Sequence, residues 1–196
     1  MFAIDPKLPT YAQEIASQLQ SRQQRRLQAE HSGRAAVLVP ILPQDNGYAF
    51  LLTQRTHKVE THKGQISFPG GVQHETDKDP LQTALRETQE EIGLRPERIS
   101  VLGEFDEYFS ITGLIVASFV GWITEPVHLL PNPDEVEEIL KVPFSNFQEM
   151  QRLRVEKRKR SGVERNVYFY DCEGKEVWGL TAQIIRDLLK LIGKPT

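Results

Sequence analysis

The apolar residues of this chain follow two spacings, one typical of strands and one typical of amphipathic helices. The unbroken apolar run AAVLVPIL, residues 35–42, predicts a buried strand, and Asn46-Gly47 after it predicts the turn of a hairpin. Further strands are predicted at residues 48–53, 99–107 and 114–123, with a late hairpin that joins LRVEKRKR to VYFY. Strands therefore occur along most of the chain, and several pair through short turns.

Five helices are predicted, and the one at residues 80–92 has the clearest boundaries. Asp79 can cap its free amides, Pro80 suits the first helical position, and Gly93 suits the stop. The apolar spacing predicts a buried stripe of Leu81, Leu85, Thr88 and Ile92. The other helices are predicted at residues 9–30, 134–139, 144–151 and 181–191.

Mixed strands and helices without a clear linker predict one α/β domain of the α+β type, with a mixed central sheet between helices. We place this domain at residues 31–196, after an N-terminal helical appendage at residues 1–30. The second half of the appendage, SRQQRRLQAE, is basic and is interpreted as a solvated face. The apolar edges of this region could pair two chains into a homodimer.

The composition of the chain argues against several classes of protein. With 39% apolar and 26% charged residues the chain is typical of soluble globular proteins, and its net charge of -3 argues against broad nucleic-acid binding. The single cysteine, Cys172, excludes an internal disulfide and fits a reducing compartment. No apolar run is long enough to cross a bilayer, and the N-terminus lacks a secretory pattern, so we expect a cytoplasmic protein without a membrane partner.

The candidate chemistry lies in the helix at residues 80–92. Glu87, Glu90 and Glu91 fall within five residues and group on a different side of the helix from its apolar stripe. Like charges at this spacing repel, and a shared divalent cation would offset the repulsion and polarise phosphate oxygens. Arg86 could brace one carboxylate, and Gly70-Gly71 would let backbone approach a metal or phosphate. The alternative is a solvated acidic face.

Two segments resemble a known family. Arg86-Glu87-Thr88-Gln89-Glu90-Glu91-Ile92-Gly93-Leu94 resembles the second half of the Nudix box, although Asp77 stands where that box usually has Glu, one residue further from the Arg. Leu51-Leu52-Thr53-Gln54-Arg55-Thr56, followed by Gly64 to Gly71, resembles the signature of the coenzyme A pyrophosphatase branch. Thr56 and Glu60 depart from that signature, which has Ser or Ala and Arg at these places.

The resemblance implies a Nudix-like fold and a metal-dependent hydrolase of a nucleoside diphosphate linked to another group. In the branch, the substrate is coenzyme A or a derivative, and the products are 4′-phosphopantetheine and adenosine 3′,5′-bisphosphate. Mg²⁺ or Mn²⁺ would be held by the three glutamates and the Gly70 carbonyl, with Glu87 or Glu90 as base and Arg86 orienting a glutamate. The predicted substrate-binding residues are Arg34, Arg55, Lys58, Lys63 and Gly71.

Other interpretations remain open at this point. Glu60, an acid where the branch has a cation, would suit a different diphosphate such as a nucleoside diphosphate sugar or a dinucleotide. Asp77 in place of Glu would suit a nucleotide-binding module without catalysis. The basic stretch at residues 152–160 would suit an RNA-directed hydrolase. His57, His62 and His74 near the box could suggest zinc, but they follow no recognised ligand spacing and read as surface residues.

Overall fold

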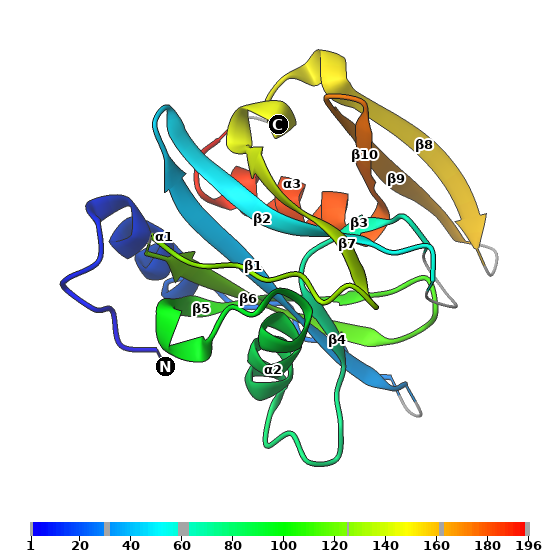
Figure 1. Cartoon of the computed structure of the whole chain (residues 1–196). Helices are drawn as coiled ribbons and strands as arrows, with labels where there is room; N and C mark the ends of the chain where they lie inside the picture. Colours follow the sequence, from blue (N-terminus) through cyan, green and yellow to red (C-terminus); the bar gives the residue numbers. More distant parts are fainter. Residues whose placement is uncertain (1, 30–31, 59–62, 125, 161–162, 195–196) are drawn as a thin grey trace.

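The protein is described here as a computed structural model that covers the chain except residues 1, 30–31, 59–62, 125, 161–162 and 195–196. A mixed seven-stranded sheet forms its centre (Figure 1). The main path of this sheet runs β3-β2-β1-β6-β5, with β4 paired to β1 and β7 paired to β2. The strands are β1 (Arg34–Gln44), β2 (Gly47–Arg55), β3 (Ile66–Ser67), β4 (Gly70–Val72), β5 (Ile99–Phe109), β6 (Ile115–Ile123) and β7 (Val136–Pro143).

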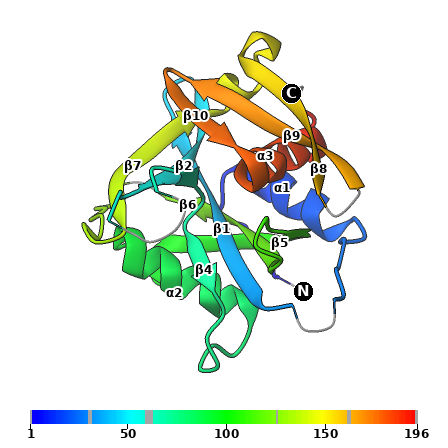
Figure 2. The same ribbon diagram turned by 90° about the vertical axis from the view of Figure 1, so that its right-hand side faces the viewer.

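Helices cover both faces of this sheet (Figure 2). Alternate residues of β1 enter two separate cores: Val39 and Ile41 pack on the side of α1 (Thr10–Gln20) and α3 (Gly179–Leu191). Leu38 and Leu42 pack on the side of α2 (Pro80–Ile92). Successive strand side chains point to opposite faces, so the run AAVLVPIL supplies both layers. The predicted architecture, a mixed sheet between helices, is confirmed.

A second, antiparallel sheet carries the late hairpin. It has the order β10-β9-β8, with β8 at Leu153–Arg160, β9 at Val163–Cys172 and β10 at Lys175–Trp178. Helix α3 packs against β9 and β10. Short 3₁₀ turns complete the fold at Pro96–Arg98, Phe144–Phe147 and Met150–Arg152. No helix among the described residues is long and apolar enough to cross a membrane.

Two predicted helices after residue 130 were wrong. Residues 136–139, predicted to be helical, belong to β7, where Val136 to Pro143 pairs antiparallel with β2. The acidic run favours a helix locally, but the backbone groups of β2 are available for pairing and the sheet contacts prevail. Residues 144–151 form two 3₁₀ turns instead of a continuous helix.

The first helix also ends early, at Gln20 instead of residue 30. The chain then runs extended along the outer strand β5, and we call residues 22–29 the N-terminal strap. Arg22 Nη2 lies 2.8 Å from Asp106 Oδ1, and Arg26 Nη1 lies 2.7 Å from Glu104 Oε1. The Glu107 N–H donates to the Arg25 carbonyl at 3.0 Å. The basic run is therefore paired with acidic residues of β5 and covers the edge of the sheet.

Candidate active site

Helix α2, which carries the three glutamates, packs against β4, which begins with Gly70 and Gly71. The carboxylate of Glu87 packs so closely against Gly71 that a Cβ at position 71 would lie 2.5–2.6 Å from its atoms. Gly70 has a φ of +153°, and a Cβ there would collide with the backbone of Ala36 and Val37 in β1. Glycine at both positions therefore lets β4 pair with β1 while Glu87 approaches it from α2.

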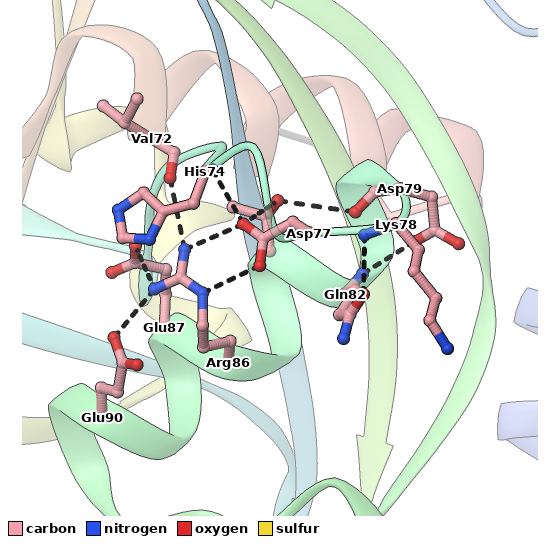
Figure 3. A network of polar contacts seen from close by, with 10 residues as sticks. Val72, His74, Asp77, Lys78, Asp79, Gln82, Arg86, Glu87 and Glu90 are labelled. Carbon is pink, nitrogen blue, oxygen red and sulfur yellow. Dashed lines mark hydrogen bonds and ion pairs between the residues drawn. The ribbon is translucent and has the colours of Figure 1, made fainter.

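Arg86 organises one side of the site (Figure 3). Its guanidinium donates to both oxygens of Asp77, with Nε–Oδ1 and Nη2–Oδ2 distances of 3.0 Å. Nη1 also lies 2.9 Å from Glu87 Oε1 and 2.9 Å from Glu90 Oε2. Nη2 donates to the Val72 carbonyl at 3.3 Å, so Arg86 ties α2 to β4. This arginine thus fixes two of the three glutamates by charge-assisted hydrogen bonds.

Asp77 is a buried partner of Arg86. The hydrogen bonds from Arg86 hold the pKa of Asp77 well below its usual range, and bonds from the His74 N–H and the Thr83 hydroxyl act in the same direction. Asp77 thereby closes the loop between β4 and α2 and keeps Arg86 in place. Its position in the sequence showed a departure from the Nudix box, whereas the structure gives it a positioning contact.

Glu91 differs from the other two glutamates because it is buried, with 3% of its surface exposed. The sequence predicted an exposed acidic cluster, and for Glu91 this was wrong: α2 lies between the sheet and the segment before β7, where the Asn132 N–H donates to the Glu91 carbonyl at 2.8 Å. Burial raises the pKa of Glu91 to about 8, while Arg55 and the Gly70 backbone oppose this rise. Burial likewise raises the pKa of Glu87.

Only one of the two carboxylate oxygens of Glu91 has a polar partner among the described residues. Its nearest cation is Arg55 at the end of β2, whose Nη1 lies 3.6 Å from Glu91 Oε1. Over the residues that the structure describes, neither the buried Oε2 nor Arg55 Nε has a hydrogen-bond partner. Such an orphaned carboxylate oxygen is costly in a folded protein. The charges of Glu87 and Glu135 raise the pKa of Glu91 further, so negative charge exceeds positive charge here.

The donor set suits a hard divalent cation, for which carboxylate oxygens are the usual ligands. Glu91 Oε2 is the strongest candidate ligand for such a cation, because it is buried and unpaired in the described part of the chain. Glu87 and Glu90 are instead turned to Arg86, and within the described ranges no three Asp, Glu, His or Cys side chains converge on one point. The residues therefore fit a metal by chemistry and by the orphaned oxygen, and a bound ion would compete with Arg86 for Glu87 and Glu90.

Of the predicted substrate residues, Arg55 and Gly71 lie at the glutamates. Arg34 Nη2 pairs with Glu107 of β5, and this arginine lines a hollow of about 420 Å³ together with Leu27 and Ile115. Lys58 is 71% exposed, and its Nζ lies 4.0 Å from Asp134 Oδ1. Lys63 is exposed. Glu60 and His62 lie outside the described residues.

Two acidic residues outside the predicted site residues have notable positions in the structure. Glu135 was one of several acids in a predicted helix, but its charge acts on Glu87 and Glu91 because the turn before β7 places it there. Thr56 N–H donates to the Glu135 carbonyl at 2.9 Å, which joins this turn to β2. Glu107, fully buried in β5, was not singled out, and only the strand alternation around it could have indicated that it points inward.

Comparisons with known proteins identify the family and support the fold. Residues 32–165 match the family model described as the NUDIX domain. A protein of Photorhabdus laumondii named "Uncharacterized Nudix hydrolase NudL" is 35% identical over 84% of this chain and 87% of its own length. A protein of Klebsiella pneumoniae with the same name is 38% identical over 82% and 83%. The crystal structure of a MutT/nudix family protein from Enterococcus faecalis covers 95% of this chain and 81% of its own, with a TM-score of 0.51 at 17% identity, and shares the fold.

Proposed function

The chain belongs to the Nudix hydrolase family, and from this premise we propose that it is a metal-dependent diphosphatase acting on coenzyme A or a derivative of it. One observation carries the proposal. The two segments that resemble the coenzyme A pyrophosphatase signature end at Arg55 and at Gly70-Gly71, and both ends meet the glutamates of α2. The signature and the acidic cluster thus belong to one site, although they are separate in the sequence.

The glutamates would hold the metal. A bound Mg²⁺ or Mn²⁺ supplies Lewis-acid polarisation of phosphate oxygens and a more acidic water. Glu91 would be its firmest ligand because Oε2 has no other partner, and Glu87, Glu90 and the Gly70 carbonyl would complete the set. Arg86, held by Asp77, would position the carboxylates and would not touch substrate.

The reaction cleaves the diphosphate with water. The water oxygen bonds to one phosphorus, the bond from that phosphorus to the bridging oxygen breaks, and the bridging oxygen leaves with the other phosphate. A glutamate takes the proton of the water. Glu87 suits this role better than Glu90, because burial raises the pKa of Glu87 and a base works best when its pKa approaches the working pH. Arg55 would pair with phosphate oxygens of the substrate.

Turnover of a substrate panel tests the proposal. The panel contains coenzyme A, dephospho-coenzyme A, a nucleoside diphosphate sugar and a dinucleotide, each with Mg²⁺, with Mn²⁺ and with chelator. We expect adenosine 3′,5′-bisphosphate and 4′-phosphopantetheine from coenzyme A, at least tenfold faster than turnover of the sugar or dinucleotide, and no product with chelator. Faster turnover of another diphosphate would reject coenzyme A and implicate Glu60. A ligand bound without any turnover would favour the binding module.

A further inference from the structure

The Arg55–Glu91 pair is poorly formed for a buried ion pair. Nη1 and Oε1 are 3.6 Å apart, which is beyond hydrogen-bond reach, and neither Arg55 Nε nor Glu91 Oε2 has a partner in the part of the chain that the structure describes. Buried ion pairs normally satisfy their remaining donors and acceptors with further hydrogen bonds, because both charges have lost water. This contact therefore stabilises the ionised form of Glu91 only weakly and does not bind it tightly.

The backbone of Arg55 is fixed by hydrogen bonds, whereas part of its side chain is exposed to solvent. The Arg55 N–H donates to the Gln65 carbonyl at 3.0 Å, and the Arg55 carbonyl accepts from the Gly64 N–H at 3.1 Å. The pairing of β2 with β7 is irregular between Gln54 and Arg55. The side chain remains 25% exposed, in contrast to the 4% of Glu91. The guanidinium can therefore turn toward solvent without unfolding the strand.

We propose that Arg55 is an exchangeable partner of Glu91: its guanidinium holds this carboxylate in the metal-free protein and moves to the anionic substrate when a divalent cation occupies Glu91. The inference rests on the proposed function, because it assigns Arg55 a role at that same site. It adds that the positive charge which recognises the substrate is withheld until the metal is present.

Charge balance drives the exchange. A divalent cation at Glu91 Oε2 would stand beside a guanidinium that touches the other oxygen of the same carboxylate, and the two positive charges would repel each other. Because the Arg55 side chain is partly exposed, the guanidinium can move from Glu91 toward solvent. A phosphate bound to the cation would then attract it. Metal and anionic ligand should therefore bind in order, with the metal first.

Direct binding of Mn²⁺ without substrate gives the first test, in the wild-type chain, in Arg55→Met and in Arg55→Lys. Removal of the competing charge should tighten Mn²⁺ binding at least fivefold in Arg55→Met. Arg55→Lys keeps a cation beside Glu91 and should stay within about threefold of wild type. Lys78→Met is the matched control, because Lys78 is an exposed cation beside α2 whose side chain points away from Glu87 and Arg86 (Figure 3). It should change Mn²⁺ affinity less than twofold.

Binding of α,β-methylene-ADP, a diphosphate with a P–C–P link, gives the second test. With saturating Mn²⁺, Arg55→Met should weaken its binding about tenfold. With chelator, the same substitution should change its binding less than twofold, because Arg55 is then occupied by Glu91. Equal losses with and without metal would overturn the exchange, as would weaker Mn²⁺ binding in Arg55→Met. If Arg55→Met does not fold, the wild-type and Arg55→Lys titrations carry the test: a lysine that cannot span to the phosphate should lose affinity only with Mn²⁺ present.

These measurements need no turnover and no coenzyme A, so the two proposals can fail separately. A protein that cleaves none of the diphosphates and still shows both effects at Arg55 would retain the exchange and lose the proposed reaction. A protein that cleaves coenzyme A without either effect would retain the reaction and lose the exchange.

Discussion

Two glutamates are almost completely buried in this protein, and their surroundings differ in kind. Glu107 in β5 has 1% of its surface exposed and receives the Arg34 guanidinium, a second contact from Arg26 at 3.7 Å, and the Leu27 N–H at 2.6 Å. Glu91 in α2 has 3% exposed, one arginine at 3.6 Å and an oxygen without a partner. Glu107 belongs to the central sheet, and Glu91 belongs to a helix that packs against it.

On the proposed function, the difference separates a carboxylate that supports the fold from one that would bind the metal. The partners of Glu107 come from the N-terminal strap and β1, so this carboxylate fastens the strap to the sheet. Glu91 has too little positive charge around it, and the deficit is the one that a divalent cation would fill. A buried carboxylate that is satisfied within the chain supports the fold, whereas one left unsatisfied indicates a site for an external cation.

The strongest test of this contrast is Glu91→Gln. We expect turnover to fall on the order of 10²–10³-fold, since a metal ligand supplies several kcal/mol of transition-state stabilisation. The melting temperature in chelator should stay the same or rise, because Gln cannot ionise, whereas Glu91 acquires an unsatisfied buried charge as the pH approaches its pKa of about 8. Steady-state kinetics and thermal unfolding check both parts. Near-normal turnover would remove Glu91 from the metal site.

The same substitution at the other buried glutamate, Glu107→Gln, should lower the stability of the fold. Arg34 would lose its charge partner and Arg26 the more distant of its two, and we expect the free energy of unfolding to fall by about 2–3 kcal/mol. Turnover per folded molecule should remain at least tenfold higher than in Glu91→Gln. Denaturant titrations measure the first quantity. If the Glu107 variant lost turnover and kept its stability, the contrast between the two sites would be reversed.

Titration of Glu91 should make the stability of the folded protein depend on pH. Burial raises its pKa to about 8, above the usual 4.5, so between these values the folded protein retains a proton that the unfolded chain releases. Stability then falls as the pH rises. We expect this group to contribute a loss of about 2 kcal/mol between pH 6 and pH 8 in chelator. The loss should be absent in Glu91→Gln. An equal slope in both proteins would assign the titration to another group.

The smallest expected effect belongs to Arg26→Ala. Arg26 is 56% exposed and pairs with Glu104 at 2.7 Å on the surface of the strap, where solvent screens the charges. We expect a loss of about 0.5 kcal/mol that shrinks further at 1 M salt. Unfolding at low and high salt checks this. A loss as large as that of Glu107→Gln would mean that the exposed cation, and not the buried partners, holds the strap.

The sequence predicted well those features that local signals determine. Helix α2 begins and ends where the sequence predicted, after Asp79 and before Gly93. Asp79 accepts a hydrogen bond from the Gln82 N–H at 2.8 Å, Pro80 is the first helical residue, and Gly93 has the left-handed conformation. The Asn46-Gly47 turn between β1 and β2 was likewise predicted correctly. The resemblance also led to the correct family. Each of these signals lies within a few neighbouring residues.

The features that sequence reasoning missed depend on contacts between distant segments. The predicted stripe of α2 was right for Thr88 and Ile92, which are buried, whereas Leu81 and Leu85 are only partly buried. Thr83 and Glu91 are also buried, and their polar side chains gave no sign of it in the sequence. Residues 136–139 became a strand because β2 offered an edge. Glu107 meets the strap across about eighty residues of sequence. No local periodicity reports such pairings, because tertiary contacts override propensity.

The parallel pairing of β1 with β6 has a consequence for biosynthesis. Arg34 to Ile41 pairs with Ile115 to Trp122, so the apolar strand AAVLVPIL cannot complete its place in the sheet until a segment some eighty residues further along has left the ribosome. At translation rates of about 5–20 residues per second, that interval lasts roughly 4–16 s. During this time the β1–β2 hairpin can form, while one edge of β1 stays open to other chains. The nascent N-terminal half is therefore the stage at which this protein depends most on protection from aggregation.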